Sequence, residues 1–255
     1  MKRMLIAGVF VLTAAAQALA ADMPAPFPSP QPPASYYPAA APFNWGGFYV
    51  GANGGYGFGT SSWVAAAVTG IPPAPSSSAI ATGPFNLRGL LAGGTLGLNL
   101  QANDFVFGVE TDGDWTNLNG SSSYCSMPLP FPIGAAAGAT CETKSVVFGT
   151  LRGRLGYAFG RVLVYGTGGV AGAKVEAGLN PPATFDNAAN FGWTAGAGIE
   201  FAFADNWTAK VEYLYASVGT MTCNTPANCG TSVPVSVSLA ENIVRAGINY
   251  KFGPW

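Results

Sequence analysis

The chain contains no histidine in its 255 residues. Histidine is the usual proton-transfer residue beside a nucleophilic serine, and it is the commonest protein ligand of transition metals. Its absence excludes Ser-His-Asp catalysis and histidine-ligated metal centres. We therefore expect no catalytic residues, no cofactor and no enzyme activity.

Charge is also scarce, because only 9% of the residues are charged while 49% are hydrophobic. The formal net charge of −1 argues against a nucleic-acid partner. Long hydrophobic runs are missing as well: beyond the N-terminal segment no stretch reaches the 18 or so apolar residues that a membrane-spanning helix needs. High apolarity without long apolar runs is typical of a transmembrane β-barrel, in which only every second residue faces lipid.

The first 21 residues have the pattern of a cleaved signal peptide. Lys2 and Arg3 precede a short apolar core, and the small residues near Ala20 and Ala21 form a cleavage site. Residues 22–43 are rich in proline and alanine, which predicts an extended periplasmic linker. Such a linker could contact peptidoglycan or a periplasmic partner. We predict that residues 44–255 form the folded barrel.

From Trp45 onward the chain alternates between segments of strand character and connections of two kinds. The connections are short at 102–104, 159–161 and 204–206, whereas those at about 60–84, 118–143, 179–189 and 220–238 are long. The eight predicted strands span residues 47–59, 85–101, 105–117, 144–159, 162–178, 190–204, 207–219 and 239–252. An even strand number with alternating short and long connections predicts an all-β, antiparallel, up-and-down outer-membrane barrel with short periplasmic turns and long extracellular loops.

Most of these strands have one apolar face and one polar or glycine-rich face. A soluble β-sandwich would also alternate, but two observations favour lipid. Aromatic residues gather near the short turns and again, as Trp115 and Trp193, about ten residues further along, which spans roughly 23 Å of a tilted strand. The opposite face is too poor in charge for a solvated surface. Arg88 breaks the rule because it shares parity with Leu96, which requires either a bulge or a position above the membrane.

The few charged residues fall mainly on the polar parity, which should face the lumen. An eight-stranded barrel is just wide enough inside for side chains to fill it, and an unpaired buried charge costs several kcal/mol. We therefore predict a lumen charge network and no wide channel. The predicted members are Glu110, Asp112, Arg152, Arg154, Glu200, Lys210, Glu212 and Arg245. A calcium site on Glu110, Asp112 and Asp114 is a less favoured alternative, and we assign no metal-binding residues.

The four cysteines form two pairs that are each close in sequence. Cys125 and Cys141 belong to one polar stretch, and Cys223 and Cys229 to another. Each pair can close a local disulfide in an oxidising compartment. A four-cysteine metal site is disfavoured because the sequence has no C-x-x-C pair.

Five segments together resemble one family. They are "FNWGGFYVGANGGYGFG" (43–59), "GLNLQANDFVFGVE" (97–110), "GTLRGRLGYAFGRVLVYGTGG" (149–169), "GWTAGAGIEFAFADNWTAKVEYLY" (192–215) and "NIVRAGINYKFG" (242–253). The sequence resembles the alphaproteobacterial outer-membrane immunogenic or porin-family proteins, which have an eight-stranded outer-membrane β-barrel domain. The resemblance covers nearly all of residues 44–253.

The resemblance implies an abundant surface antigen in the outer membrane of a Gram-negative bacterium, in contact with outer-membrane lipid and lipopolysaccharide. It also implies that the last strand is read by the barrel-assembly machinery, with Tyr250, Phe252 and Trp255 as the signal residues. The lipases, acyl transferases and proteases that share small barrels depend on histidine, so none of their activities can be carried over.

Three functional hypotheses follow. The first is a structural barrel that contributes to envelope integrity and presents surface loops. The second is a small porin for small solutes, since inward glycines could leave space in the lumen. The third is a surface ligand-binding or adhesion protein that uses the cysteine-containing loops. The sequence does not indicate an oligomeric state.

Overall fold

The computed structural model describes residues 43–65, 80–123, 140–180, 184–223 and 235–253. The predicted signal peptide and most of the predicted linker lie outside these ranges, as do Cys125, Cys229 and Trp255. The strands are β1 (Gly47–Ala65), β2 (Ile80–Ala102), β3 (Phe105–Ser122), β4 (Thr140–Phe159), β5 (Val162–Asn180), β6 (Thr184–Ala202), β7 (Trp207–Cys223) and β8 (Val235–Phe252). None of the described residues forms a helix long and apolar enough to cross a membrane.

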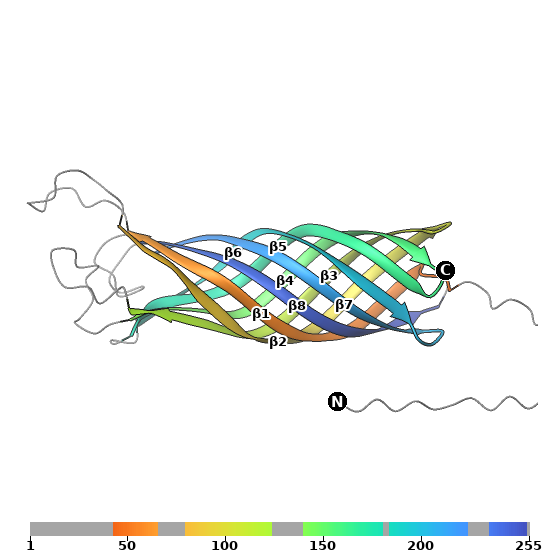
Figure 1. Cartoon of the computed structure of the whole chain (residues 1–255), viewed down its shortest axis with the longest axis horizontal. Helices are drawn as coiled ribbons and strands as arrows, with labels where there is room; N and C mark the ends of the chain where they lie inside the picture. The colour runs from red at the N-terminus through yellow and green to blue at the C-terminus, as the bar shows by residue number, and fades with distance from the viewer. Residues whose placement is uncertain (1–42, 66–79, 124–139, 181–183, 224–234, 254–255) are drawn as a thin grey trace, which may run out of the picture. The chain divides into compact units, whose positions relative to one another are not determined.

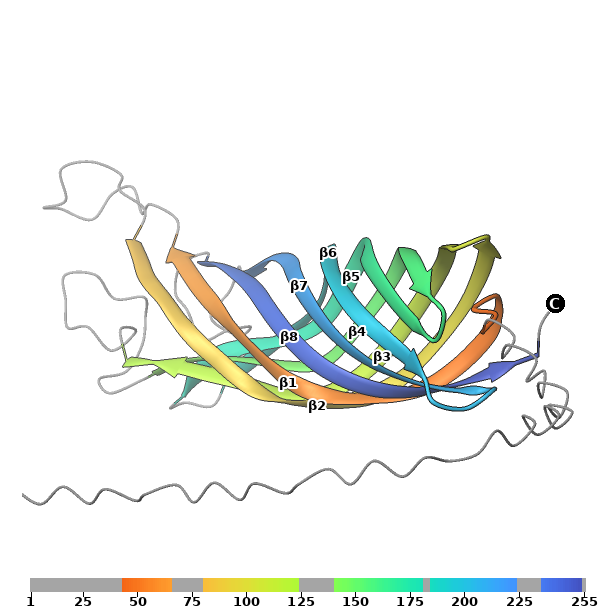
Figure 2. The same cartoon turned by 45° about the vertical axis from the view of Figure 1, so that its right-hand side comes forward.

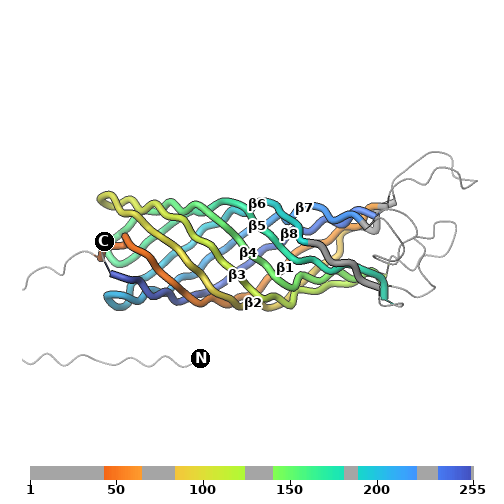
Figure 3. The backbone as a smooth tube through the Cα atoms, turned by 180° about the vertical axis from the view of Figure 1, so that it is seen from behind, coloured from red at the N-terminus to blue at the C-terminus, as the bar shows by residue number. Residues whose placement is uncertain are grey.

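The eight strands pair in chain order with antiparallel neighbours, and β1 pairs with β8 to close the barrel (Figures 1 and 3). Paired residues followed once around the barrel from Phe252 on β8 lead back to Asn242 on the same strand, a displacement of ten residues. Eight strands with this stagger tilt by about 40° and enclose a narrow interior. The oblique course of the strands is visible in Figure 2.

The predicted strands agree well with the structure at the end that carries the short turns. At the other end every strand is longer than predicted: β1 continues past residue 59 to Ala65, and β6 begins at Thr184 instead of 190. These extensions contain many Ser, Thr, Asn and Gly residues, which single-sequence patterns assign to loops. The cross-strand ladder holds them in place, and a segment considered alone does not show that ladder.

The predicted two-faced pattern is confirmed along the strands. The aromatic residues near the short turns point outward, among them Phe105, Phe201 and Trp207. Trp115 and Trp193 point outward higher up, with 75% and 54% of their surfaces exposed. Arg88 is also exposed, and the β1–β2 register runs without a shift from Gly47 to Ser62, so no bulge separates Arg88 from Leu96. Of the two explanations for Arg88, the bulge is excluded.

Beyond the upper aromatic residues both faces of the barrel change character. Outward positions there are mainly polar, for example Thr60, Asn86 and Asn119. Inward positions are mainly apolar, and Phe148 and Ile243 are almost completely buried there. Strands of 17–23 residues exceed the roughly 9–11 needed to cross a bilayer, so the excess continues into a polar environment. In that part the barrel is apolar inside and polar outside, like a soluble protein.

Candidate functional site

The lumen is the candidate functional site, because nearly all buried charge of the described chain lies in it. Its side chains form three layers along the barrel axis. An apolar layer closes the end with the short turns, a charged layer fills the middle, and a second apolar layer fills the far part.

The charged side chains reach the lumen because successive residues of a strand point to opposite faces. Glu110, Asp112 and Asp114 are consecutive inward positions of β3, and Arg152 and Arg154 are inward on β4. The strands opposite contribute Glu200 from β6, Lys210 and Glu212 from β7, and Arg245 from β8. All eight residues of the predicted network lie in this layer, together with Asp114, which the prediction left out.

Two arginines connect most of the carboxylates. Arg152 Nη2 lies 2.9 Å from Asp112 Oδ2, and its Nη1 lies 3.0 Å from Glu212 Oε1. Arg245 Nη2 lies 2.6 Å from Asp112 Oδ1 and 2.7 Å from Glu212 Oε2, and its Nη1 lies 3.1 Å from Asp114 Oδ2. Each carboxylate shared in this way is compensated from two sides. Burial of such a charge is tolerated only under these conditions.

The other two cations extend the network toward the short turns. Lys210 Nζ lies 2.9 Å from Glu110 Oε2, and Arg154 pairs with Glu200. Glu200 also accepts hydrogen bonds from Thr208 and from Asn249, the latter at 2.9 Å. Strands on all sides of the barrel are therefore crosslinked through its centre.

Two tyrosines complete the layer, and sequence patterns did not single them out. The Tyr49 hydroxyl donates to Glu110 Oε2 at 2.7 Å, and the Tyr165 hydroxyl donates to Glu212 Oε1 at 3.1 Å. The Arg154 guanidinium carbon lies 3.6 Å from the centre of the Tyr165 ring, a cation–π contact.

Some inward glycines make room for bulky side chains, so at Gly57, Gly97 and Gly198 the expectation that inward glycines leave space in the lumen is wrong. A Cβ on Gly97 would lie 2.2 Å from Tyr49 Cζ, and one on Gly198 would lie 2.5 Å from the Tyr165 hydroxyl oxygen. A Cβ on Gly57 would lie 2.8 Å from Leu118 Cδ2. Glycine is needed here for close approach, and the volume it leaves is filled by the neighbouring side chain.

A plug at the short-turn end was also not predicted. The chain before β1 turns into the barrel mouth, where Trp45 is 2% exposed and meets the Phe43 ring edge-on with centroids 4.8 Å apart. The indole N–H of Trp45 donates to the Gly160 carbonyl at 3.1 Å, and its backbone N–H donates to Gln101 Oε1 at 2.6 Å. Phe43, which the sequence assigned to the linker, is thus part of the barrel.

Glu241 is a buried acid outside the network. It faces the far apolar layer with 0% exposure, between Leu239 and Ile243. Neither carboxylate oxygen has a hydrogen-bond partner among the described residues, although the Ser145 hydroxyl lies near enough to interact. An isolated charge in such surroundings is costly, so this residue should destabilise the barrel.

The two kinds of acid predict opposite effects for the same substitution. Glu241→Leu should raise the free energy of unfolding by about 1–3 kcal/mol, because an unsatisfied polar group is replaced by an apolar one. Glu212→Leu should lower it by about 3–5 kcal/mol, because Arg152 and Arg245 lose a shared partner. Urea titration of the refolded barrel in vesicles measures both. Equal losses in the two variants would contradict the distinction.

Metal and disulfide predictions have different outcomes. Asp112 pairs with Arg152 and Arg245, and Asp114 pairs with Arg245 through Oδ2, so both carboxylates take part in ion pairs in place of the calcium site considered as an alternative. Within the described ranges no cluster of acids or cysteines has the arrangement of a metal site.

Cys141 is disulfide-bonded, and its partner lies outside the residues whose side chains are described. The predicted pairing therefore stays a prediction.

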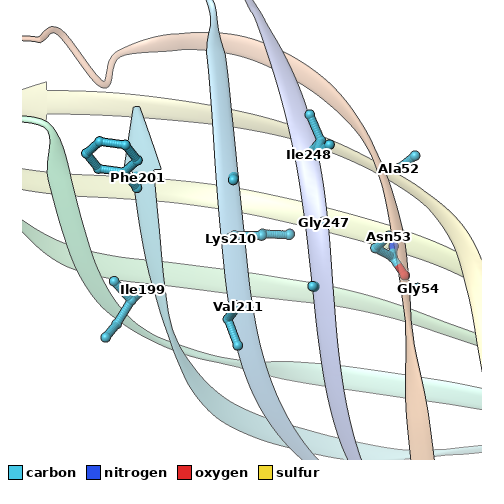
Figure 4. Close-up of a pocket in the computed structure, with 11 residues that line it drawn as sticks. Ala52, Asn53, Gly54, Ile199, Phe201, Lys210, Val211, Gly247 and Ile248 are labelled. Carbon is cyan, nitrogen blue, oxygen red and sulfur yellow. The ribbon is translucent and has the colours of Figure 1, made fainter. Parts of the chain in front are cut away.

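Hollows also occur on the outer wall of the barrel. One groove of about 800 Å³ crosses β6, β7, β8 and β1 (Figure 4). Small outward residues such as Ala52, Ala209 and Ala246 form its floor, and Ile199 and Phe201 flank it. Its outward side chains are apolar, as expected for a wall that contacts lipid.

Comparison with known proteins identifies relatives over the whole chain. Residues 33–252 match the family model described as outer membrane protein beta-barrel domain. The 31 kDa outer-membrane immunogenic protein of Brucella melitensis is 34% identical over 99% of this chain and 100% of its own length. The 25 kDa outer-membrane immunogenic protein of Brucella abortus is 29% identical over 99% of both chains. The crystal structure of Neisserial surface protein A covers 80% of this chain and 97% of that one, with 14% identity and a TM-score of 0.40.

Proposed function

This chain belongs to the outer membrane protein β-barrel domain family and is an outer-membrane protein of a Gram-negative bacterium, and we propose that it is a non-enzymatic structural barrel with a sealed lumen. In this role it contributes to the integrity of the envelope and carries its surface loops on a rigid base.

The observation that carries the proposal is the layered filling of the lumen. The plug around Trp45, the ion pairs of Arg152 and Arg245, and the buried Phe148 occupy three successive levels of the interior. A solute would have to displace all three. Breaking the charged level alone would leave buried charges unpaired, at a cost of several kcal/mol.

The small-porin hypothesis is less well supported, because Gly57, Gly97 and Gly198, which face inward, are packed against leucine and tyrosine side chains. The adhesion hypothesis depends on the cysteine-containing loops, most of which lie outside the described residues. Contacts with the barrel-assembly machinery, through Tyr250 and Phe252, and with peptidoglycan, through residues 22–43, remain proposals drawn from the sequence.

Planar-bilayer recordings test the sealed lumen. The purified protein should insert without discrete conductance steps, because no continuous aqueous path crosses the three layers. A general porin in the same membrane gives the positive control, and a gel-mobility shift between heated and unheated samples shows that the barrel is folded. Stable, uniform conductance steps from folded protein would refute the proposal.

A further inference from the structure

A second groove on the outer wall differs from the one in Figure 4 because the cation that lines it is exposed. Lys210, which lines the groove of Figure 4, is buried and its ammonium pairs with Glu110. It has a volume of about 460 Å³ and lies over β3, β4, β5 and β6. Its floor includes Gly149, where an added Cβ would meet only the Asp112 carbonyl oxygen within 4 Å, at 3.3 Å. Outward side chains of Leu151 and Val170 form one wall. Phe191, which is 78% exposed, lies against Gly172 at the upper end.

Lys174 lies at the upper end of this groove. It is exposed, and among the described residues it makes no ion pair. Val147 pairs with Lys174 in the β4–β5 register and with Trp115 in the β3–β4 register, so the exposed indole belongs to the same row. Tryptophan at the end of an apolar band marks the headgroup level of a membrane.

The height of Lys174 agrees with that level. It lies twelve residues beyond Val162, the first residue of β5 after a short turn. Twelve residues of a strand tilted by about 40° rise roughly 30 Å, just beyond an apolar band of about 25 Å. Short turns face the periplasm in barrels of this type, so Lys174 lies at the outer leaflet.

We propose that this groove binds lipopolysaccharide, with an acyl chain along the apolar floor and a lipid phosphate on Lys174. The groove supplies apolar contact, and the lysine supplies charge complementarity at the depth where phosphates lie. Glu176 is the next outward residue of β5 and lies opposite Lys144 in register. Lys144 also lies 3.4 Å from Glu142, so Lys174 is the cation of this region that is left for an external anion.

Native mass spectrometry of the full-length folded protein tests the proposal. The protein in neutral detergent is mixed with equal amounts of purified lipopolysaccharide and phosphatidylglycerol. We expect one lipopolysaccharide to be retained in preference to the phospholipid. Lys174→Gln should weaken retention about fivefold, which corresponds to about 1 kcal/mol for one surface cation. Gly149→Leu, which fills the floor, should weaken it to a similar extent.

Two matched variants control for general effects of charge and size. Arg88→Gln removes another exposed cation that lines neither groove, and Ala246→Leu fills the groove of Figure 4. Both should retain lipopolysaccharide like the unmodified protein. The heat-dependent gel shift confirms that every variant is folded.

Retention that is unchanged in both Lys174→Gln and Gly149→Leu would overturn the proposal, as would equal retention of phosphatidylglycerol or of dephosphorylated lipopolysaccharide. The inference depends on the outer-membrane location and not on a sealed lumen. A conducting barrel that still retains lipopolysaccharide through Lys174 would refute only the proposed function.

Discussion

Replacing Arg245 by leucine is expected to lower the free energy of unfolding by about 3–5 kcal/mol. Arg245 lies within 4 Å of four carboxylates: 2.6 Å from Asp112, 2.7 Å from Glu212, 3.1 Å from Asp114 and 3.9 Å from Glu110. The described charged layer holds five carboxylates and four cations, so the loss of one cation leaves two negative charges in excess. Urea titration of the barrel refolded in lipid vesicles, followed by tryptophan fluorescence, measures the effect.

Arg88→Leu is the matched control, because it removes the same side chain from an exposed position. It should change the free energy of unfolding by no more than about 0.5 kcal/mol. Arg245→Lys should fall between the two, since lysine keeps the charge but cannot bind several carboxylates with one planar group. A loss below about 1 kcal/mol for Arg245→Leu would show that the network does not hold the barrel together.

Removal of the Trp45 side chain should be almost as damaging. Trp45→Ala is expected to cost about 3–5 kcal/mol, because a buried indole is lost and the mouth of the barrel cannot collapse around the space. The Gly160 carbonyl also loses its hydrogen-bond donor. The same urea titration applies, and Trp115→Ala, which truncates a 75%-exposed outward indole, should cost clearly less.

Trp45→Ala also bears on the sealed lumen. We expect the variant to remain non-conducting, because the charged layer above the plug stays intact. Conductance after this single change would mean that the plug alone closes the lumen. Equal destabilisation by Trp45→Ala and Trp115→Ala would contradict the structural role assigned to the plug.

Parity along most strands was readable from the sequence because it is a local property. The exceptions were the second strand, where Arg88 breaks the pattern, and the fifth, where glycines hide it. Successive side chains of a strand point to opposite faces wherever the strand lies in the barrel. Glu110 and Asp112, like Arg152 and Arg154, could therefore be assigned to the lumen before any pairing was known. The short turns were readable for the same reason, since two strands that meet in three residues must be antiparallel neighbours.

The ion-pair partners of the lumen residues could not be predicted from the sequence. Arg152 reaches Glu212, 60 residues away, and Arg245 reaches Asp114, 131 residues away. Which residues meet across these sequence separations depends on the ten-residue stagger of the closed barrel. Every pair of neighbouring strands contributes to that stagger. Tyr49 and Tyr165 were not predicted, because their role is to fill the space left by glycines on other strands, Gly97 and Gly198.

The upper ends of the strands also could not be predicted from the sequence. Serine, threonine and glycine between residues 60 and 84 have a loop-like composition, yet Thr60 and Ser61 belong to β1. Most outward residues there are polar because the wall has left the apolar band, and most inward residues are apolar, although Ser61 faces inward and bonds the Thr143 hydroxyl. The sequence shows alternation of some kind at these positions, but the height at which the two faces exchange character depends on tilt and stagger.

The amino-acid sequence by itself determined the strand number, the direction of the two faces on most strands, the short turns and the residues that carry charge into the lumen, because each follows from neighbours within a few residues. Only the tertiary structure decided the stagger, the ion-pair partners, the plug formed by Phe43 and Trp45, the isolation of Glu241 and the groove below Lys174. Each of these depends on groups that closure of the barrel brings together from distant strands, and such contacts leave no local pattern in the chain.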